Sequence, residues 1–282
     1  MIIGTDMALS DRIDEQARAF YRDAMRTLQQ ARVRFLIGGA FALESYAGIS
    51  RWTKDLDLFV RPSDREAVLS ALRERGYPTE LRFPHWLAKV FARHPGGGPA
   101  IDVIFSSGNG LCTVDDGWVD HAVPAIVLGI PVWLIPPEEM IWSKAFVMER
   151  DRYDGADIAH LVRVRAKSLD WPRLLRRFGE HWRVLLCHLA LFGYIYPAQR
   201  LQVPHWIMDE LWRRFEIEAS CPPRDHRLCQ GTLLSWSQYL QHIERGEYYD
   251  ARHRPHGMLT ETETALVTER LSREQERNDH GR

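Results

Sequence analysis

Hydrophobic and polar residues alternate along the first part of the chain with the periods of helices and strands. Apolar residues spaced by three and four predict an amphipathic helix that ends near Ala31, with Ser10 as its N-cap. The short apolar run from Val33 to Ile37 then predicts a buried strand. The residues of the helical stripe are Ile13, Ala17, Phe20, Ala24 and Leu28.

The next stretch contains a glycine pair and a strand with an alternating pattern. Gly38 and Gly39 directly follow the first strand and open a short segment with helical character. Polar and apolar residues then alternate over residues 55–60, which predicts a second strand. Because successive side chains of a strand point to opposite faces, Asp55 and Asp57 share one face.

Further helices and strands follow up to about residue 135. A capping box over residues 63–66 predicts a helix that Gly76 ends. The glycine-rich segment 95–99 predicts the turn of a hairpin, since it lacks the lysine and the helix of a phosphate-binding loop. We expect strands at 86–92, 100–105, 125–128 and 132–135, and a loop at 106–120 anchored by Trp118.

The second half of the chain has mainly helical patterns. Proline followed by Glu138 and Glu139 predicts the start of a helix over residues 138–150. An aromatic-rich helical region extends from 171 to 243, and the last residues are polar and charged. We therefore predict an α+β protein with a mixed-sheet domain over 1–135, an α-helical domain over 136–258 and a flexible tail over 259–282.

Composition places the chain among ordinary globular proteins. Of 282 residues, 45% are hydrophobic and 27% are charged, and the formal net charge is -1, so no basic field indicates DNA binding. The sequence has no apolar run long enough to span a membrane and no leader, which predicts a cytoplasmic protein. Four cysteines are too few for a disulfide framework and fit a reducing compartment.

The aspartate pair and the glycine pair suggest chemistry. Two carboxylates side by side repel each other unless a cation lies between them, and oxygen ligands favour a hard divalent ion. Asp55 and Asp57 therefore predict a magnesium site. Gly38 and Gly39 let a ligand approach the backbone, and free N–H groups at a helix start attract phosphate.

A third carboxylate, Asp102, interrupts an apolar strand. An isolated carboxylate among isoleucine, valine and phenylalanine is costly to bury without a partner. One explanation is a residue that faces solvent at the end of a strand. The other is a third carboxylate of the metal site, and we favour the metal site.

Together these residues resemble the nucleotidyltransferase superfamily with the DNA polymerase β-like fold. Its signature is an apolar strand, a glycine pair, a helix and an Asp-x-Asp strand, which Gly38, Gly39, Asp55 and Asp57 match. The resemblance implies a mixed sheet and two Mg²⁺ ions, with Mn²⁺ as the alternative. It also implies that Asp102, from a later strand, completes the metal site and activates the acceptor hydroxyl, so that Asp55, Asp57 and Asp102 are the catalytic and metal residues.

A second, looser resemblance covers residues 138–161. This stretch is similar to AbiEii-like and related minimal nucleotidyltransferases, which carry a lysine on one helix and an Arg/Lys-Asp-x-x-Asp pattern on the next. It implies that Lys144, Arg152 and Asp157, with Asp154 in the same pattern, face the nucleotide. The alternative is a solvated helix face with local ion pairs.

The resulting hypothesis is transfer of a nucleoside monophosphate from an NTP to an acceptor hydroxyl, with release of pyrophosphate. The resemblance leaves the acceptor open among tRNA, protein and a small molecule. Some proteins of this kind are toxins that have a cognate antitoxin. An alternative is a non-catalytic nucleotide-binding or partner-binding module on the same fold. A third is a phosphotransferase or nuclease that uses the same carboxylates.

Overall fold

The computed structural model describes residues 13–51, 53–93, 98–222, 225–266 and 268–269. The chain divides into two compact units. Unit 1 consists of the described residues up to Gly108 together with Thr113–Met140, and unit 2 consists of Asn109–Cys112 and the described residues from Ile141 onward. The sequence analysis places the division between residues 135 and 136, just before this boundary.

Unit 1 is built around one seven-stranded sheet. Its strands are β1 (Leu36–Ile37), β2 (Asp55–Phe59), β3 (Thr79–Phe83), β4 (Leu87–Phe91), β5 (Ala100–Ile104), β6 (Val123–Val127) and β7 (Ile130–Leu134). Its helices are α2 (Glu15–Gln30), α3 (Gly39–Ala47), the 3₁₀ turn η1 (Pro62–Asp64), α4 (Arg65–Glu74) and α5 (Asp116–Asp120).

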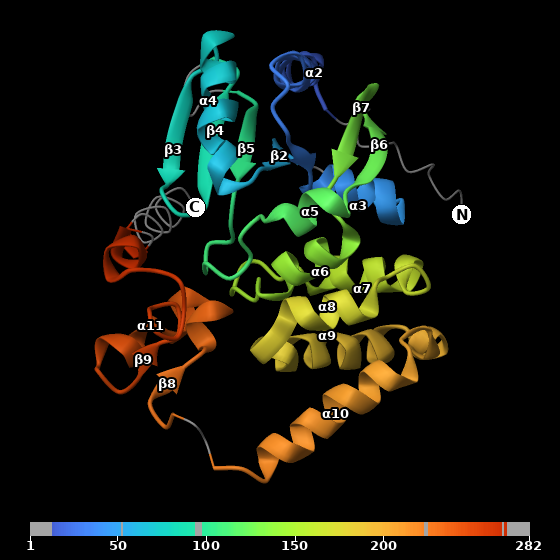
Figure 1. Ribbon diagram of the computed structural model, residues 1–282, viewed down its shortest axis with the longest axis vertical. Coiled ribbons are helices and arrows are strands. Elements are labelled where there is room, and N and C mark those ends of the chain that lie inside the picture. Colours follow the sequence, from blue (N-terminus) through green and yellow to red (C-terminus); the bar gives the residue numbers. More distant parts are fainter. Residues whose placement is uncertain (1–12, 52, 94–97, 223–224, 267, 270–282) are drawn as a thin grey trace. The chain divides into compact units, whose positions relative to one another are not determined.

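The sheet is mixed, as predicted. Its strand order is β3-β4-β5-β2-β1-β7-β6, and Figure 1 shows β3, β4 and β5 on one side of β2 and the β6–β7 hairpin on the other. The pairs β2–β5 and β1–β7 are parallel, whereas the other neighbours are antiparallel. The predicted hairpin of β6 and β7 at the edge of the sheet is confirmed.

Helix α2 forms the scaffold that its apolar stripe predicts. Its buried face includes Phe20, Ala24 and Leu28, and the helix contacts α4 and β7. The N-cap is Asp14, whose carboxylate accepts a hydrogen bond from the N–H of Ala17 at 2.8 Å. Ser10, the predicted cap, lies outside the described residues.

Several local predictions differ from the structure. The first strand comprises only Leu36–Ile37, and Asp116–Asp120 forms a short helix inside the predicted loop, where Trp118 is fully buried as expected. The predicted capping box of Ser63 and Glu66 is wrong, because Ser63 lies in η1 and the N-cap of α4 is Asp64, which makes no side-chain bond to the first turn. Strand β3 was not predicted, since its exposure follows no alternation.

Unit 2 is mainly helical. Its elements are α6 (Pro137–Ala145, which begins in unit 1), α7 (Gly155–Arg165), α8 (Trp171–Phe178), η2 (Gly179–His181), α9 (Trp182–Ile195), η3 (Pro197–Gln202), α10 (His205–Ala219), β8 (Leu228–Cys229), η4 (Gly231–Leu233), α11 (Trp236–Glu244) and β9 (Tyr249–Asp250). Helix α9 contacts α7, α8 and α10, and Figure 1 shows it below α7 and α8.

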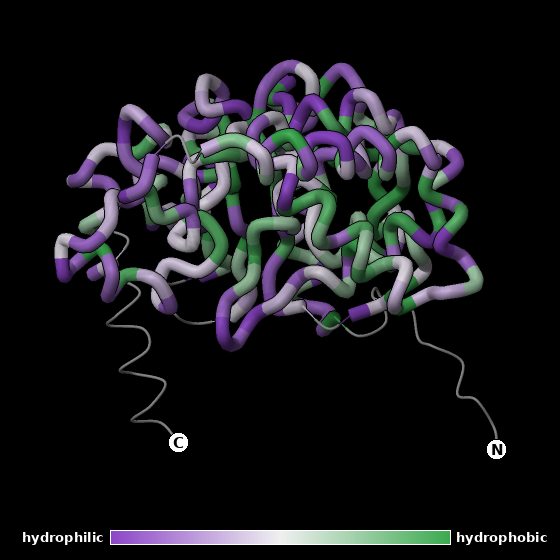
Figure 2. Tube along the Cα trace, turned by 90° about the horizontal axis from the view of Figure 1, so that it is seen from below, coloured by the Kyte–Doolittle hydropathy of each residue, from purple (hydrophilic) through white to green (hydrophobic). Residues whose placement is uncertain are grey.

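Polar contacts hold the later part of unit 2 together. Asp250 on β9 is buried and accepts hydrogen bonds from Arg252, also buried, and from the Thr232 hydroxyl at 2.7 Å. Helix α6 ends at Ala145 instead of the predicted Arg150, because the chain reverses where Met148 pairs with Tyr153. In Figure 2 hydrophilic residues, drawn in purple, occupy most of the outer turns of the trace.

The part of the chain that the structure describes contains no helix with the length and apolar character needed to cross a membrane. Of the predicted tail, residues 261–266 are helical and Leu259 is buried, whereas 270–282 lie outside the described residues.

We expect Asp14→Ala to lower the free energy of unfolding by about 1 kcal/mol, because the N–H of Ala17 loses its capping acceptor. Urea denaturation at pH 7 measures the difference. Gln16→Ala, an exposed change in the first turn of the same helix, serves as the control and should stay within about 0.5 kcal/mol of wild type. Equal effects of the two changes would contradict the assigned cap.

Candidate active site

Three aspartates lie on one face of the unit 1 sheet. Asp55 and Asp57 are on β2, and Asp102 is on the adjacent parallel strand β5. The register pairs Asp57 with Asp102 and Asp55 with Ala100. Since directly opposed residues share a face, the three carboxylates point to the same side of the sheet. The alternate residues fill the core on the opposite face and are fully buried: Leu56, Leu58, Ile101 and Val103.

A lysine that the sequence analysis did not select lies beside these carboxylates. Lys89 on β4 is directly opposite Asp102 across the β4–β5 pair. Its Nζ is 2.6 Å from Oδ1 of Asp102 and 3.8 Å from Oδ2 of Asp55. Burial lowers the pKa of Lys89, but the negative charge of Asp102, its hydrogen bond and the charge of Asp55 together raise the pKa above its ordinary value. The site therefore contains a permanent cation.

The glycine pair lies directly against Asp57. The N–H of Gly38 donates to the backbone carbonyl of Asp57 at 3.0 Å. Gly39 has a φ of +56°, and a Cβ added to it would overlap the Asp57 carboxylate. A side chain here would therefore meet both backbone strain and a steric clash. Glycine at position 39 is required for the closeness of α3 to Asp57.

This packing places a helix N-terminus beside the acidic face. Helix α3 begins at Gly39, and its N-cap residue Gly38 has no side chain that bonds to the first turn. The N–H groups of a first turn have no partner inside their own helix, and they carry the positive end of the helix dipole. A phosphate group is the ligand that this arrangement favours.

Aromatic residues limit the acidic face along β2. Phe59 shares this face with Asp55 and Asp57 and stacks on Trp118, with ring centroids 5.4 Å apart. At the other end of β2, the hydroxyl of Tyr21 donates to the carbonyl of Lys54 at 2.8 Å. Burial and the nearby charge of Asp55 raise the pKa of Tyr21, so it remains a neutral donor.

The donor set fits a hard divalent cation, because three carboxylates supply only oxygen ligands. Nevertheless, within the described ranges of the chain no three His, Cys, Asp or Glu side chains are gathered as a metal site requires. At Asp102, Lys89 explains why the carboxylate is not gathered with the other two: its ammonium already lies against one oxygen of Asp102.

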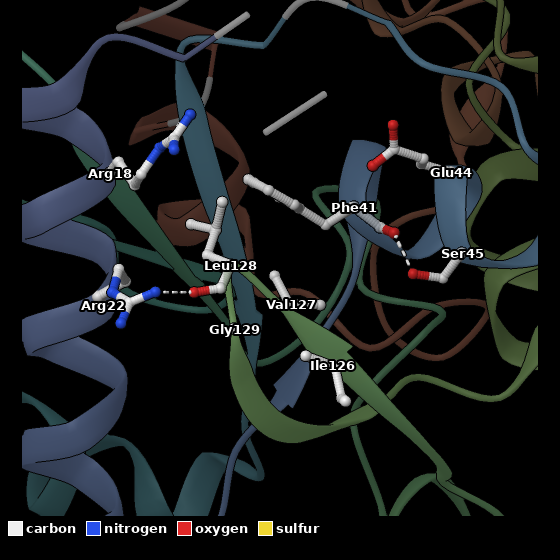
Figure 3. A pocket seen from close by; sticks show the side chains of 9 residues that line it. All are labelled: Arg18, Arg22, Phe41, Glu44, Ser45, Ile126, Val127, Leu128 and Gly129. Atoms are coloured by element: carbon white, nitrogen blue, oxygen red, sulfur yellow. Dashed lines mark hydrogen bonds between the residues drawn. The ribbon is translucent and has the colours of Figure 1, made fainter. Parts of the chain in front are cut away.

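A cavity of about 380 Å³ also lies in unit 1, between α2, α3 and the β6–β7 hairpin (Figure 3). The guanidinium of Arg22 crosses to the hairpin and donates to the carbonyl of Leu128, a residue with a φ of +50°. None of the three aspartates lines this cavity, and the sequence analysis selected none of its lining residues. These are Arg18, Arg22, Phe41, Glu44, Ser45, Ile126, Val127, Leu128 and Gly129.

Comparison with known families places the chain in a family. A family described as "uncharacterised nucleotidyltransferase" matches residues 17–192, which is more than half of the chain and includes both strands that carry the aspartates. The chain belongs to this nucleotidyltransferase family. The matched range also includes Gly38, Gly39 and Lys89. A search of curated protein sequences found no match. The AbiEii-like subtype stays a prediction.

Several solved structures resemble the nucleotidyltransferase at low sequence identity. The antibiotic-resistance factor ANT(2'')-Ia is 16% identical, with a TM-score of 0.42 over 62% of this chain and 98% of that one. An antigenic nucleotidyltransferase-like protein from Paracoccidioides brasiliensis is 16% identical, with a TM-score of 0.43 over 67% and 92%. The lincosamide adenylyltransferase LnuA, solved with lincomycin, is 15% identical, with a TM-score of 0.37 over 54% and 98%.

The remaining predicted nucleotide-binding residues form a separate network within unit 2. The Nζ of Lys144, on α6, is 2.8 Å from Oδ2 of Asp154 and 2.8 Å from Oδ2 of Asp157. Arg152 also donates to Asp154, at 3.1 and 3.2 Å. The side chains of Lys144, Asp154 and Asp157 are nearly buried, whereas that of Arg152 is 69% exposed. The four predicted residues of unit 2 are therefore connected by ion pairs with one another.

Lys89 is the functional candidate that the sequence analysis missed in the nucleotidyltransferase. A signal for it exists, because a single lysine interrupts the apolar strand Leu87–Phe91. A buried ammonium is costly unless it has a negative partner. The same reasoning that selected Asp102 would thus have selected Lys89.

We expect Gly39→Ala to reduce nucleotidyl transfer by at least about 100-fold, because the new Cβ displaces Asp57 and small misplacements of a reacting group have effects of this size. Gly48→Ala is a matched control at the other end of α3: its φ is +66°, and a Cβ there meets nothing within 4 Å. Gly48→Ala should cost about 1–2 kcal/mol of stability from backbone strain, and Gly39→Ala should cost more because its Cβ also clashes with Asp57, both measured by thermal denaturation. A similar loss of activity in both variants would contradict the role of Gly39.

The Lys144 network predicts a dependence of stability on pH. Burial raises the pKa of Asp154, but the charges of Lys144 and Arg152 and their hydrogen bonds bring it below the ordinary value of 3.8. A carboxyl with a lowered pKa in the folded state stabilises the fold above its unfolded pKa and loses this effect as the pH falls toward its folded pKa. The Asp154 contribution should therefore be complete at pH 7 and decline below about pH 4.

We expect Lys144→Met to lower the free energy of unfolding at pH 7 by about 3–5 kcal/mol, because two buried carboxylates lose their cation. The decline below pH 4 should become shallower, since the pKa of Asp154 moves back upward. Urea denaturation at pH 7 and pH 3 measures both effects. Lys167→Met, at an exposed position after α7, is the control and should change neither value appreciably.

Proposed function

We propose that this nucleotidyltransferase moves a nucleoside monophosphate from an NTP to an acceptor hydroxyl and releases pyrophosphate. The observation that carries the proposal is the placement of Asp55, Asp57 and Asp102 on one sheet face, directly beside the N-terminus of α3. A metal-bound triphosphate needs two kinds of ligand. The carboxylates supply oxygen ligands for the cation, and the uncapped helix start supplies N–H donors for the phosphates.

The proposed cofactor is Mg²⁺, with Mn²⁺ as a substitute, held by Asp55, Asp57 and Asp102. When bound, a divalent ion neutralises charge on the phosphates and stabilises the attacking and leaving oxygens. The family resemblance implies two ions, and the contacts of Lys89 bear on that number.

The residues of the chain would then have distinct tasks. The first-turn N–H groups of α3 bind phosphate oxygens, and Gly39 permits that close approach. Asp102 accepts the proton of the acceptor hydroxyl, whose oxygen forms the new bond to the α-phosphorus. The bond from the α-phosphorus to the bridging oxygen breaks, and pyrophosphate leaves with that oxygen.

We also propose that Lys144, Arg152 and Asp157 contribute to nucleotide binding. This proposal is supported by the charged network that these residues share in unit 2. In that network the Arg152 guanidinium is largely exposed and suited to bidentate contact with phosphate. The proposed acceptor is a tRNA, a protein or a small molecule, and the assay below distinguishes these classes. A cognate antitoxin is a further prediction.

The test is incubation of the purified chain with each α-labelled NTP, Mg²⁺ and three acceptor pools: total RNA, lysate protein and a small-molecule fraction. We expect label on one pool together with pyrophosphate. Asp57→Asn should reduce labelling by at least about 100-fold, a typical effect of losing one charged group from such a site. Asp120→Asn changes an exposed aspartate of the same unit and should leave labelling unchanged.

Two outcomes would contradict the proposal. Label that arrives from the γ-position instead of the α-position would indicate a phosphotransferase. NTP binding without label in any pool would favour the non-catalytic binding module.

A further inference from the structure

We propose that the ammonium of Lys89 takes the place of one of the two divalent ions, so that the site works with a single ion held chiefly by Asp55 and Asp57. This inference rests on the proposed nucleotidyl transfer. It concerns a residue outside the Gly-Gly and Asp-x-Asp signature, and it changes the number of metal ions that this signature implies.

The register of three strands fixes the position of Lys89. Residues 89, 102 and 57 are directly opposite one another across β4, β5 and β2, so their side chains form one row on the acidic face. The Nζ of Lys89 contacts Asp102 at 2.6 Å and lies 3.8 Å from Asp55. The ammonium thus lies near carboxylates of two different strands, as a bridging cation would.

The surroundings of Lys89 keep its ammonium in this position. Leu87 and Phe91, the neighbours on the same face of β4, are both buried, and only 24% of the Lys89 side chain is exposed. An ammonium in such surroundings requires a negative partner, and Asp102 supplies it. A second metal ion at Asp102 would have to displace this ammonium or lie beside a like charge.

The carboxylates themselves are consistent with one ion rather than two. Asp102 is turned to Lys89, whereas Asp57 lies against the start of α3, where phosphate is expected. The ion that arrives with the NTP would then bind on the β2 side.

Lys89 would perform the task of the absent ion at the acceptor. The acceptor hydroxyl gives its proton to the carboxylate of Asp102, and its oxygen attacks the α-phosphorus. The ammonium stabilises the negative charge that develops on that oxygen and keeps Asp102 oriented. Lys89 is thus a catalytic residue that also positions Asp102, and its charge is the property that matters.

The test counts bound Mn²⁺ by electron paramagnetic resonance in the presence of an NTP analogue with a non-cleavable α,β-methylene bridge. We expect one Mn²⁺ per protein–nucleotide complex for wild type and two for Lys89→Met, because the methionine keeps the apolar stem and removes the charge. Lys89→Arg retains the charge and should bind one. Arg82→Met removes a neighbouring cation on β3 that pairs with Glu80, and it should also bind one.

Two Mn²⁺ ions on wild type, or one on a folded Lys89→Met variant, would overturn the inference. If Lys89→Met does not fold, as judged by circular dichroism, the wild-type count still decides, because two ions there would exclude substitution by Lys89. Complete absence of nucleotide–Mn²⁺ binding to wild type would instead count against the proposed function. The two failures are therefore distinguishable.

A second measurement separates this role from a merely structural one. At Mg²⁺ concentrations that fill only the first metal site, Lys89→Met should lower kcat about 100-fold with little change in the KM for NTP, and Lys89→Arg should restore a large part of it. Higher Mg²⁺ should raise the kcat of Lys89→Met as the second ion binds, and it should leave wild type unchanged. An unchanged kcat for Lys89→Met would overturn the assigned role.

Discussion

Repulsion among three carboxylates on one face of a sheet is the constraint that unit 1 has to satisfy. The strand register brings Asp57 and Asp102 directly opposite each other, with Asp55 on the same face. Without compensation such a group would resist ionisation or push the strands apart. Two features compensate it: the Lys89 ammonium from β4, and the N-terminus of α3, which Gly39 allows to lie against Asp57. The surrounding elements are arranged so that the charge stays concentrated and accessible.

The local part of this site could be predicted from the sequence because it follows from short-range rules. Alternation along residues 55–60 places Asp55 and Asp57 on one face whatever the rest of the chain does. A glycine pair before a helix likewise indicates close backbone approach, and at Gly39 the Asp57 carboxylate approaches the backbone closely. Asp102 required a further step, since its place beside β2 depends on a pairing that is distant in sequence. The apolar residues around it supplied the signal.

Features that depend on long-range packing escaped prediction. Strand β3 has a mixed exposure pattern because it lies at the edge of the sheet, where its charged residues Glu80 and Arg82 pair with each other. Helix α6 stops at Ala145 because residues further along turn back toward it, an event that helix periodicity does not show. Lys89 was missed because a lysine in a strand is usually interpreted as solvated. Its partner is contributed by another strand.

The two lysines at the centre of the charged clusters make different use of the same chemistry. In unit 2, Lys144 contacts Asp154 and Asp157, and the exposed Arg152 also contacts Asp154, so two positive charges meet two negative charges. In unit 1, the Lys89 ammonium contacts Asp102 and lies near Asp55, on the sheet face that also carries Asp57. A second divalent ion at Asp102 would lie beside this ammonium and be repelled by it. The position of Lys89 therefore favours a single divalent ion, held on the β2 side of the face.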